Sequence, residues 1–343
     1  MRSNTLRRAV FAITLALLSA AANTGHAQTP ASTPDQSASP DIPLWAYPVV
    51  STRPKVASAT PTPKPAEGYT PRHAPGSTQT YTSAQILDLF NIPDWYPNEH
   101  PKMPPSVGVG RKPDAVPCGY CHLPNGLGRP ENQSIAGLPR EYIIQQVEDL
   151  AAGTRHSSES RMGSVNFMIR VSKAVTPEEL AEAADYFSKL KLTKWIRVVE
   201  TDTVPKTHIT GGMLVAEDQG KEPIGSRIIE VSEDYEQTEL RNQKSGFIAY
   251  VPTGSLKTGE SIVKTGANGK TMACGMCHGA DLKGMANVPG IVGRSPSQMT
   301  RQLIDFRGGA RSGQNAAMMK MPVAKLTDDD IIAITAYLAS LEP

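Results

Sequence analysis

Three features are scarce in this 343-residue chain. It has four cysteines, all within two short motifs, so no fifth cysteine is left to bind a metal or to carry a lipid near the N-terminus. Outside residues 9–22, no stretch is long and apolar enough to form a membrane helix. A charge excess is also missing: the formal net charge is +2, and nothing in the sequence indicates nucleic-acid binding.

The N-terminus has the pattern of a secretory signal peptide. Three arginines precede the apolar residues 9–22, a run too short to span a bilayer, and small residues at 25–27 offer a cleavage site after Ala27. We therefore predict a signal peptide over residues 1–27 and a periplasmic protein; the alternative is an uncleaved anchor. Cleavage would remove three arginines and no acidic residue, which leaves 32 basic and 33 acidic residues.

Two copies of the motif Cys-x-x-Cys-His carry the chemistry of the chain, at residues 118–122 and 274–278. This motif is typical of c-type haem attachment, in which both thiols bond to one haem and the histidine binds its iron. A zinc ribbon usually sets its cysteine pairs roughly 15–20 residues apart, but these pairs are 156 residues apart. A thioredoxin-like site gives no reason for a histidine after both pairs. Two haem c groups are therefore predicted, attached to Cys118, Cys121, Cys274 and Cys277, with His122 and His278 as axial ligands.

Both motifs belong to a longer internal repeat. Residues 118–155 align with residues 274–311 without a gap. After a five-residue deletion the alignment resumes, and Thr176 and Thr327 each begin a helix-capping pattern. Two domains built on one plan are the simplest account. Identical residues at matching positions include Gln146, Asp149, Gly153 and Arg155, which correspond to Gln302, Asp305, Gly309 and Arg311.

A haem that transfers electrons usually has a second protein ligand to its iron. Met168 lies seven residues before Val175, and Met319 lies seven before Leu326, at matching positions of the repeat. A methionine is more often a core side chain than a ligand, so it is the repeat that favours these two as axial ligands. The competing candidates are Met162 and His156 for the first haem, and Met318 and Met321 for the second.

The repeat also indicates residues around each haem. A ligating histidine needs an acceptor that fixes its ring, and the carbonyl groups of Gln133 and Pro289 occupy equivalent places. Arg155 and Arg311 are candidates for contacts with the haem propionates; the alternative is a solvated arginine at a helix end. Three histidines without a repeat partner are interpreted as surface or structural residues: His73, His100 and His208.

The motifs and their surroundings resemble the di-haem cytochrome c4 family and, more generally, class I c-type cytochromes. The resemblance covers residues 117–190 and 273–341, and its most specific parts are the two motifs, residues 302–311, Met319 and residues 324–331. It implies two all-α haem domains, histidine–methionine ligation of both irons, and periplasmic electron transfer. The implied ligand pairs are His122 with Met168 and His278 with Met319. This chain departs from the family in its long interdomain segment and its proline-rich N-terminus.

The remaining segments complete the predicted organisation. Residues 28–81 are rich in proline, serine and threonine and are predicted to be disordered, with Leu44–Pro48 either docked on a domain or solvated. Ser83 is expected to cap a short helix. Strand-like residues at 227–231 and 247–251 predict a β-containing insertion. The predicted fold is all-α with two cytochrome c-like domains in tandem: 1–27 signal peptide, 28–81 disordered segment, 82–195 first domain, 196–252 insertion and 253–343 second domain.

The favoured function is electron transfer between redox partners, without catalytic residues and so not as an enzyme. The expected partners are a donor dehydrogenase or quinol-oxidising complex and an acceptor oxidase or reductase, with no nucleic acid. Membrane contact is expected only through such partners or an uncleaved signal. One alternative is a cytochrome subunit of a periplasmic dehydrogenase complex. Another is a di-haem redox enzyme, such as a peroxidase, in which an axial ligand such as Met168 is displaceable.

Overall fold

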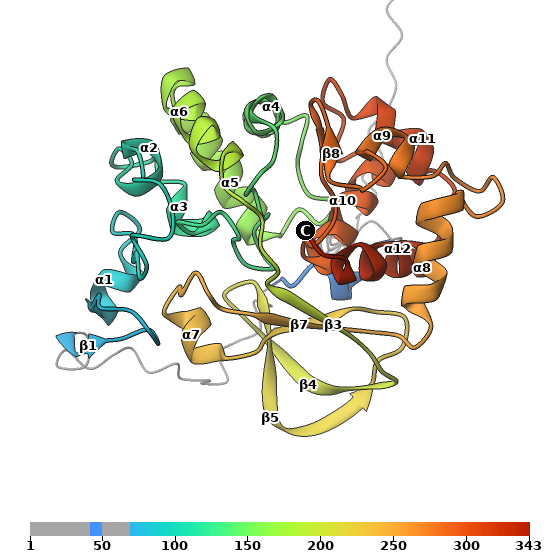
Figure 1. The fold of residues 1–343 in the computed structure, drawn as a ribbon, viewed down its shortest axis with the longest axis horizontal. Helices are drawn as coiled ribbons and strands as arrows, with labels where there is room; N and C mark the ends of the chain where they lie inside the picture. Colours follow the sequence, from blue (N-terminus) through green and yellow to red (C-terminus); the bar gives the residue numbers. More distant parts are fainter. Residues whose placement is uncertain (1–41, 50–68) are drawn as a thin grey trace, which may run out of the picture. The chain divides into compact units, whose positions relative to one another are not determined.

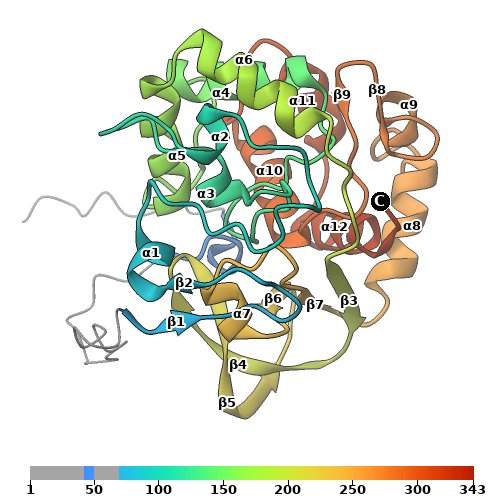
Figure 2. The same cartoon turned by 60° about the vertical axis from the view of Figure 1, so that its left-hand side comes forward.

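The computed structural model describes residues 42–49 and 69–343, so the predicted signal peptide lies outside the described residues. In this part the chain is mostly helical, with four small sheets. Figures 1 and 2 show the helices of both repeats beside a group of twisted strands. The predicted all-α class is therefore too narrow, because the strands are more numerous than the sequence indicated. No helix in the described ranges is long and apolar enough to cross a bilayer.

The helices of the two repeats correspond one to one. Helices α4 and α10 start and end 156 residues apart, and α6 and α12 start 151 residues apart, which are the two offsets of the sequence repeat. The sequence repeat is therefore a structural repeat. The first set is α2 (Pro105–Gly108), α3 (Gly119–His122), α4 (Arg140–Ala152), α5 (Gly163–Ala174) and α6 (Pro177–Ser188). The second set is α8 (Ser255–Thr265), α9 (Gly275–His278), α10 (Pro296–Gly308), α11 (Ala317–Val323) and α12 (Asp328–Ser340).

Local capping explains where several helices begin. The predicted capping boxes at Thr176 and Thr327 are confirmed, since each threonine side chain accepts from the backbone N–H three residues later, and each threonine backbone N–H donates to the carboxylate of that same residue. The short helix α1 (Ser83–Leu87) is capped by Thr82, so the predicted cap at Ser83 is wrong by one residue. Thr82 is the cap because its backbone N–H donates to the side-chain oxygen of Gln85, three residues later, at 2.8 Å.

Residues 196–252 contain most of the β structure. One sheet has the order β3-β7-β6, with β3 parallel and β6 antiparallel to β7, and β4 pairs with β5 as a hairpin. The predicted strand at 247–251 is confirmed as β7, whereas the one at 227–231 is displaced to β6 and three strands were not foreseen. The insertion comprises β3 (Ile196–Glu200), β4 (Thr203–Thr210), β5 (Met213–Pro223), β6 (Ile229–Ser232), α7 (Tyr235–Glu239) and β7 (Phe247–Val251). Two short strand pairs lie elsewhere, β1 (Pro71–Arg72) with β2 (Tyr81–Thr82) and β8 (Gly284–Met285) with β9 (Val288–Pro289).

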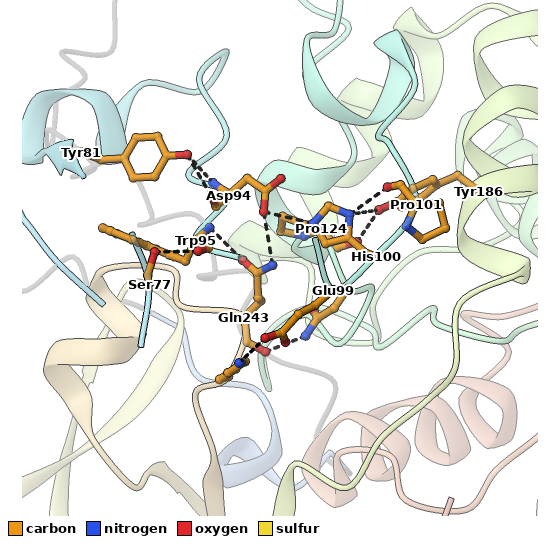
Figure 3. Close-up of polar contacts among 12 residues, drawn as sticks. Ser77, Tyr81, Asp94, Trp95, Glu99, His100, Pro101, Pro124, Tyr186 and Gln243 are labelled. Atoms are coloured by element: carbon orange, nitrogen blue, oxygen red, sulfur yellow. Dashed lines mark hydrogen bonds and ion pairs between the residues drawn. The ribbon is translucent and has the colours of Figure 1, made fainter. Parts of the chain in front are cut away.

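The insertion packs against both repeats. Strands β3 and β7 lie along α12 (Figure 1). Trp195 leads into β3; its indole N–H donates to the Gly293 carbonyl at 3.1 Å, and its ring meets the Phe247 ring edge-on. Toward the first repeat, the Trp95 backbone N–H donates to the side chain of Gln243 at 3.2 Å, as Figure 3 shows. The insertion therefore connects the two repeats instead of hanging free between them.

The stretch 42–49 docks on the second repeat, and it includes the single turn η1 (Leu44–Ala46). Tyr47 is only 2% exposed, and its hydroxyl donates to Asp305 Oδ1 at 2.9 Å. The Arg301 guanidinium donates to the Ala46 carbonyl at 3.0 Å. The predicted disorder of residues 28–81 is therefore too extensive, because aromatic side chains in this proline-rich run bury enough surface to offset the entropy of ordering. The rest of that segment up to residue 68 lies outside the described residues.

Candidate functional site

Each Cys-x-x-Cys-His motif forms one helical turn at the wall of a cavity. In both turns the histidine backbone N–H donates to the carbonyl of the first cysteine at 3.0 Å, which brings the two thiols and the imidazole toward one face. The first cavity has a volume of about 540 Å³ and the second about 610 Å³. Both volumes lie in the range of roughly 300–1,000 Å³ found for cofactor sites. Each cavity is lined by the cysteines and histidine of its own motif.

The two motif histidines are held in the same way. Nδ1 of His122 lies 2.8 Å from the Gln133 carbonyl, and Nδ1 of His278 lies 2.8 Å from the Pro289 carbonyl, as the sequence predicted. A carbonyl oxygen can only accept, so Nδ1 carries the proton and the lone pair remains on Nε2. Burial lowers the pKa of both histidines. Each ring is therefore a neutral, oriented imidazole with one nitrogen available to an iron.

The four thiols are free; Cys118, Cys121 and Cys274 are partly buried, whereas Cys277 is exposed. Burial raises the pKa of the Cys118 thiol to about 12, with the neighbouring Cys121 adding to the shift, and raises that of Cys274 to about 11. None of the four cysteines forms a disulfide in the structure. In the described ranges no group of three or more histidine, cysteine or acidic side chains could hold a metal ion.

The predicted methionine ligands line the two cavities. Met168 on α5 lines the first cavity with His122, and Met319 on α11 lines the second with His278. The competing candidates Met162 and His156 line the first cavity as well; Met162 is 1% exposed, and Nδ1 of His156 lies 3.1 Å from the Ser157 carbonyl. It is therefore the matching repeat position that favours Met168. In the second repeat Met318 also lines the cavity but is 65% exposed, whereas Met321 is 75% exposed and does not line it.

Arg155 and Arg311 meet where the two repeats join. Their backbones form an antiparallel bridge, flanked by a bond from the Ser312 N–H to the Thr154 carbonyl at 2.8 Å. The Arg155 guanidinium donates to Gln146 of its own repeat and to Gln302 of the other. The Arg311 guanidinium likewise donates to Gln302 of its own repeat and to Gln146 of the other. Burial, with the nearby Arg311 charge, lowers the pKa of Arg155 to about 10. The alternative of solvated helix-end arginines is therefore wrong, and the arginines face the cavities.

This junction is a polar wall shared by both cavities. Gln146 and Gln302 are identical across the repeat, but the sequence alone did not indicate a role for them. Tyr142 and Gln298 of this wall were not found from the sequence, because their proximity to the other residues depends on how the repeats pack. The side chains that line both cavities are Gln133, Leu138, Tyr142, Gln146, Arg155, Gln298 and Gln302.

The first cavity also receives residues from outside its own repeat. Gly211 and Gly212, at the turn of the β4–β5 hairpin, line it, as does Arg241 after α7. Pro48 from the docked N-terminal stretch lines it too. The second cavity includes no residue of the insertion. The two sites therefore share their inner geometry but differ in what encloses them.

Known proteins share sequence with large parts of this chain. The model of the Cytochrome c family matches residues 263–342. Cytochrome c-554(548) of Halomonas halodenitrificans is 38% identical over 74 residues, which cover 21% of this chain and 89% of that protein. Cytochrome c4 of Azotobacter vinelandii is 25% identical over 242 residues, which cover 69% of this chain and 88% of that protein. The chain belongs to the di-haem cytochrome c4-like family. A further relative, the "Thiosulfate dehydrogenase electron acceptor" of Thiomonas intermedia, is 24% identical over 241 residues, which cover 69% of this chain and 83% of that protein.

Membership of the cytochrome c4-like family assigns two haem c groups to the chain, and the cavities fit them. Each cavity combines thiols, an oriented imidazole and a thioether on a largely apolar wall. On the wall of the first cavity, Arg129 Nε and Ser164 Oγ are buried without a hydrogen-bond partner among the described residues. Such atoms are suited to the polar periphery of a macrocycle.

Proposed function

We propose that this chain is an exported di-haem electron-transfer protein with one haem c in each of two tandem domains, residues 82–195 and 253–343. The observation that carries the proposal is the pair of similar cavities, each lined by a Cys-x-x-Cys-His turn and a methionine at a matched repeat position. The shared wall supports an internal exchange between the two sites. Export rests on the N-terminal pattern of residues 1–27, and we infer a periplasmic location from it.

The ligand set that we propose is covalent attachment at Cys118, Cys121, Cys274 and Cys277, and axial ligation by His122 with Met168 and His278 with Met319. The haem supplies the ferric–ferrous couple. The protein's part is to hold each imidazole against a backbone carbonyl, to place a thioether in the same cavity and to keep water out. Arg155 and Arg311 supply positive charge at the shared wall, where we place the propionates. We assign no catalytic residue, which suits a carrier.

The partners that we propose are a donor such as a dehydrogenase and an acceptor such as an oxidase or reductase. A second candidate is a cytochrome subunit that remains bound to a dehydrogenase. It is favoured by the relative named as the electron acceptor of thiosulfate dehydrogenase, and by the β insertion, which offers additional surface for a stable complex. Purification of the native protein under gentle conditions separates the two, because a bound subunit co-elutes with its dehydrogenase and a carrier elutes alone.

The ferric absorption spectrum of the purified holoprotein tests the ligand set. We expect two low-spin haems, each with the weak long-wavelength band of a methionine–iron bond, and haem content of two per chain. Met168→Ala and Met319→Ala should each remove one band and lower one reduction potential, because the thioether favours ferrous iron. A high-spin haem in the unaltered protein would contradict the symmetric set. It would instead favour a redox enzyme with an open iron position.

A further inference from the structure

Four methionines form an exposed rim around the second cavity. Met276, Met285, Met318 and Met321 are 69%, 55%, 65% and 75% exposed, and the first three line the cavity. They come from α9, β8 and α11, which Figure 1 shows gathered on one side of the second repeat. Large apolar side chains exposed together usually mark an interaction site, and methionine adapts readily to a partner's surface. We call these four residues the methionine rim.

The first repeat has covered or paired side chains at every matching position. The counterparts of the methionine rim are Tyr120, Arg129, Phe167 and Arg170, at the offsets of 156 and 151 residues. Tyr120 is 5% exposed, and Arg241 of the insertion lies over its ring at 3.7 Å and bonds to its carbonyl. Phe167 is covered by Arg170 at 4.6 Å, and Arg129 forms a buried ion pair with Glu131. The exposed rim is thus specific to the second repeat and is not a consequence of the fold.

Exposed positive charge borders the methionine rim. Lys320 lies on α11 directly before the rim residue Met321, and Lys325 follows that helix; both are exposed. In the described part of the chain neither lysine forms an ion pair. Among the acidic residues near these elements, Asp281 accepts from the Lys283 N–H, Asp328 pairs with Arg307 and Asp330 pairs with Lys270, whereas Asp329 is exposed. An apolar centre with a basic border fits a partner with an apolar centre and an acidic border.

We propose that the methionine rim is the surface through which this protein docks its redox partner, an electron-transfer protein whose exposed cofactor edge is apolar and bordered by carboxylates. One electron crosses this surface per encounter, and no bond is made or broken. The insertion, by covering the matching surface of the first repeat, directs the partner to the second. This proposal rests on the proposed function, because it assumes that the second cavity holds a haem that exchanges electrons.

Binding to a defined surface tests the proposal. The probe is a gold electrode bearing a mixed monolayer of methyl-terminated and carboxylate-terminated alkanethiols, which stands in for the partner. The variant is the pair Met285→Gln with Met321→Gln, which spares the haem motif and Met319. The matched control is Leu87→Gln with Val109→Gln, two side chains that are 61% and 62% exposed outside the second repeat. Adsorption is measured by quartz-crystal microbalance, and the interfacial electron-transfer rate by voltammetry of the adsorbed holoprotein.

We expect the methionine pair to weaken adsorption by about tenfold and to slow interfacial transfer, as removal of apolar anchors from an interface centre does. The control pair should adsorb like the unaltered protein. Lys320→Gln should flatten the dependence of adsorption on salt, because it removes one border charge. The proposal is overturned if the methionine pair adsorbs normally, or if the control pair is weakened as much.

Two further measurements keep the outcomes distinct. A solution redox titration should give two reversible one-electron potentials for the methionine pair, as for the unaltered protein. If the unaltered protein shows no reversible potentials at all, the proposed function fails, whatever the adsorption result. Sedimentation equilibrium tests a second copy of the chain as the occupant: a dimer that the methionine pair dissociates would make the rim a self-association surface and overturn the partner proposal.

Discussion

The first repeat relies on neighbouring segments where the second builds its own cover. Before the second motif, the eleven-residue helix α8 crosses α12, and Gly259 allows the crossing because its backbone approaches the Ala333 carbonyl. Before the first motif, only the four-residue helix α2 takes this place, packed on α6. Residues 83–96 and the insertion supply the missing cover. The second repeat is therefore covered by its own helix α8, whereas the first repeat is covered by residues 83–96 and by the insertion.

At the junction between the repeats, it is the second repeat that depends on residues from outside itself. Asp149 in α4 accepts from Gln145 and Thr154, both of its own repeat. Its counterpart Asp305 accepts instead from Tyr47 and from the Ser158 backbone N–H, which both come from outside the second repeat. Equivalent residues in a repeat thus keep their position but take different partners. This shows that internal symmetry predicts backbone geometry better than it predicts side-chain contacts.

The largest expected effect comes from filling the close crossing in the second repeat. Gly259→Ala places a Cβ against the Ala333 carbonyl, and we expect a loss of about 3 kcal/mol in the free energy of unfolding, at the upper end for overpacking. Gly108→Ala in α2 meets only the flexible Met103, at 3.2 Å, and should cost less than about 1 kcal/mol. Urea unfolding followed by haem absorbance measures both. Equal losses would contradict the view that only the second repeat depends on a tight helix crossing.

A smaller effect is expected from the docked N-terminal stretch. Tyr47→Phe removes the hydroxyl that donates to Asp305, and leaving a buried carboxylate without this donor should cost about 2 kcal/mol. Tyr69→Phe is the matched control, because Tyr69 is 76% exposed. Thermal unfolding by circular dichroism gives the difference. If Tyr47→Phe is as stable as the control, the stretch does not support the junction.

The smallest effect is a pH dependence confined to the first repeat. His100 Nε2 lies 3.0 Å from Asp94 Oδ1, and Nδ1 lies 2.8 Å from the Pro101 carbonyl and 3.0 Å from the Tyr186 hydroxyl (Figure 3). Burial lowers the pKa of His100, but the bonds to Asp94 and Pro101 outweigh it, so the pKa is raised above its usual value. The counterpart of Tyr186 in the second repeat, Tyr337, interacts with Lys264 instead.

A raised folded-state pKa stabilises the protein fully below about pH 6.5, the unfolded value, and this contribution is lost as pH rises through the folded pKa. The unaltered protein should therefore lose stability over that interval, and His100→Gln should remove the loss. His208→Gln, at an exposed position of β4, is the control and should keep it. Denaturant midpoints between pH 5 and pH 9 provide the comparison. An unchanged pH profile in His100→Gln would contradict this assignment.

What could be predicted from the sequence was local or repeated. The capping boxes at Thr176 and Thr327 lie within four residues, and the carbonyl acceptors of the motif histidines lie eleven residues away at a constant spacing. The helices around Met168 and Met319 escaped prediction because neither has a capping side chain. The contacts of Tyr47 with Asp305 and of Arg155 with Gln302 span long separations along the chain. Pattern alone does not specify such pairs, because they depend on how the repeats pack.

The reciprocal bonds at the junction have the form of a symmetric dimer interface: Arg155 and Arg311 each contact a glutamine of their own repeat and one of the other. Because both halves belong to one chain, the local concentration of each half about the other is high, and a few polar bonds suffice to keep them together. Lengthening the connection costs little, since closure entropy grows only with the logarithm of length. A protein of this design can therefore acquire an insertion such as residues 196–252 without giving up its junction. One half can then become specialised for contact with other molecules while the other is enclosed.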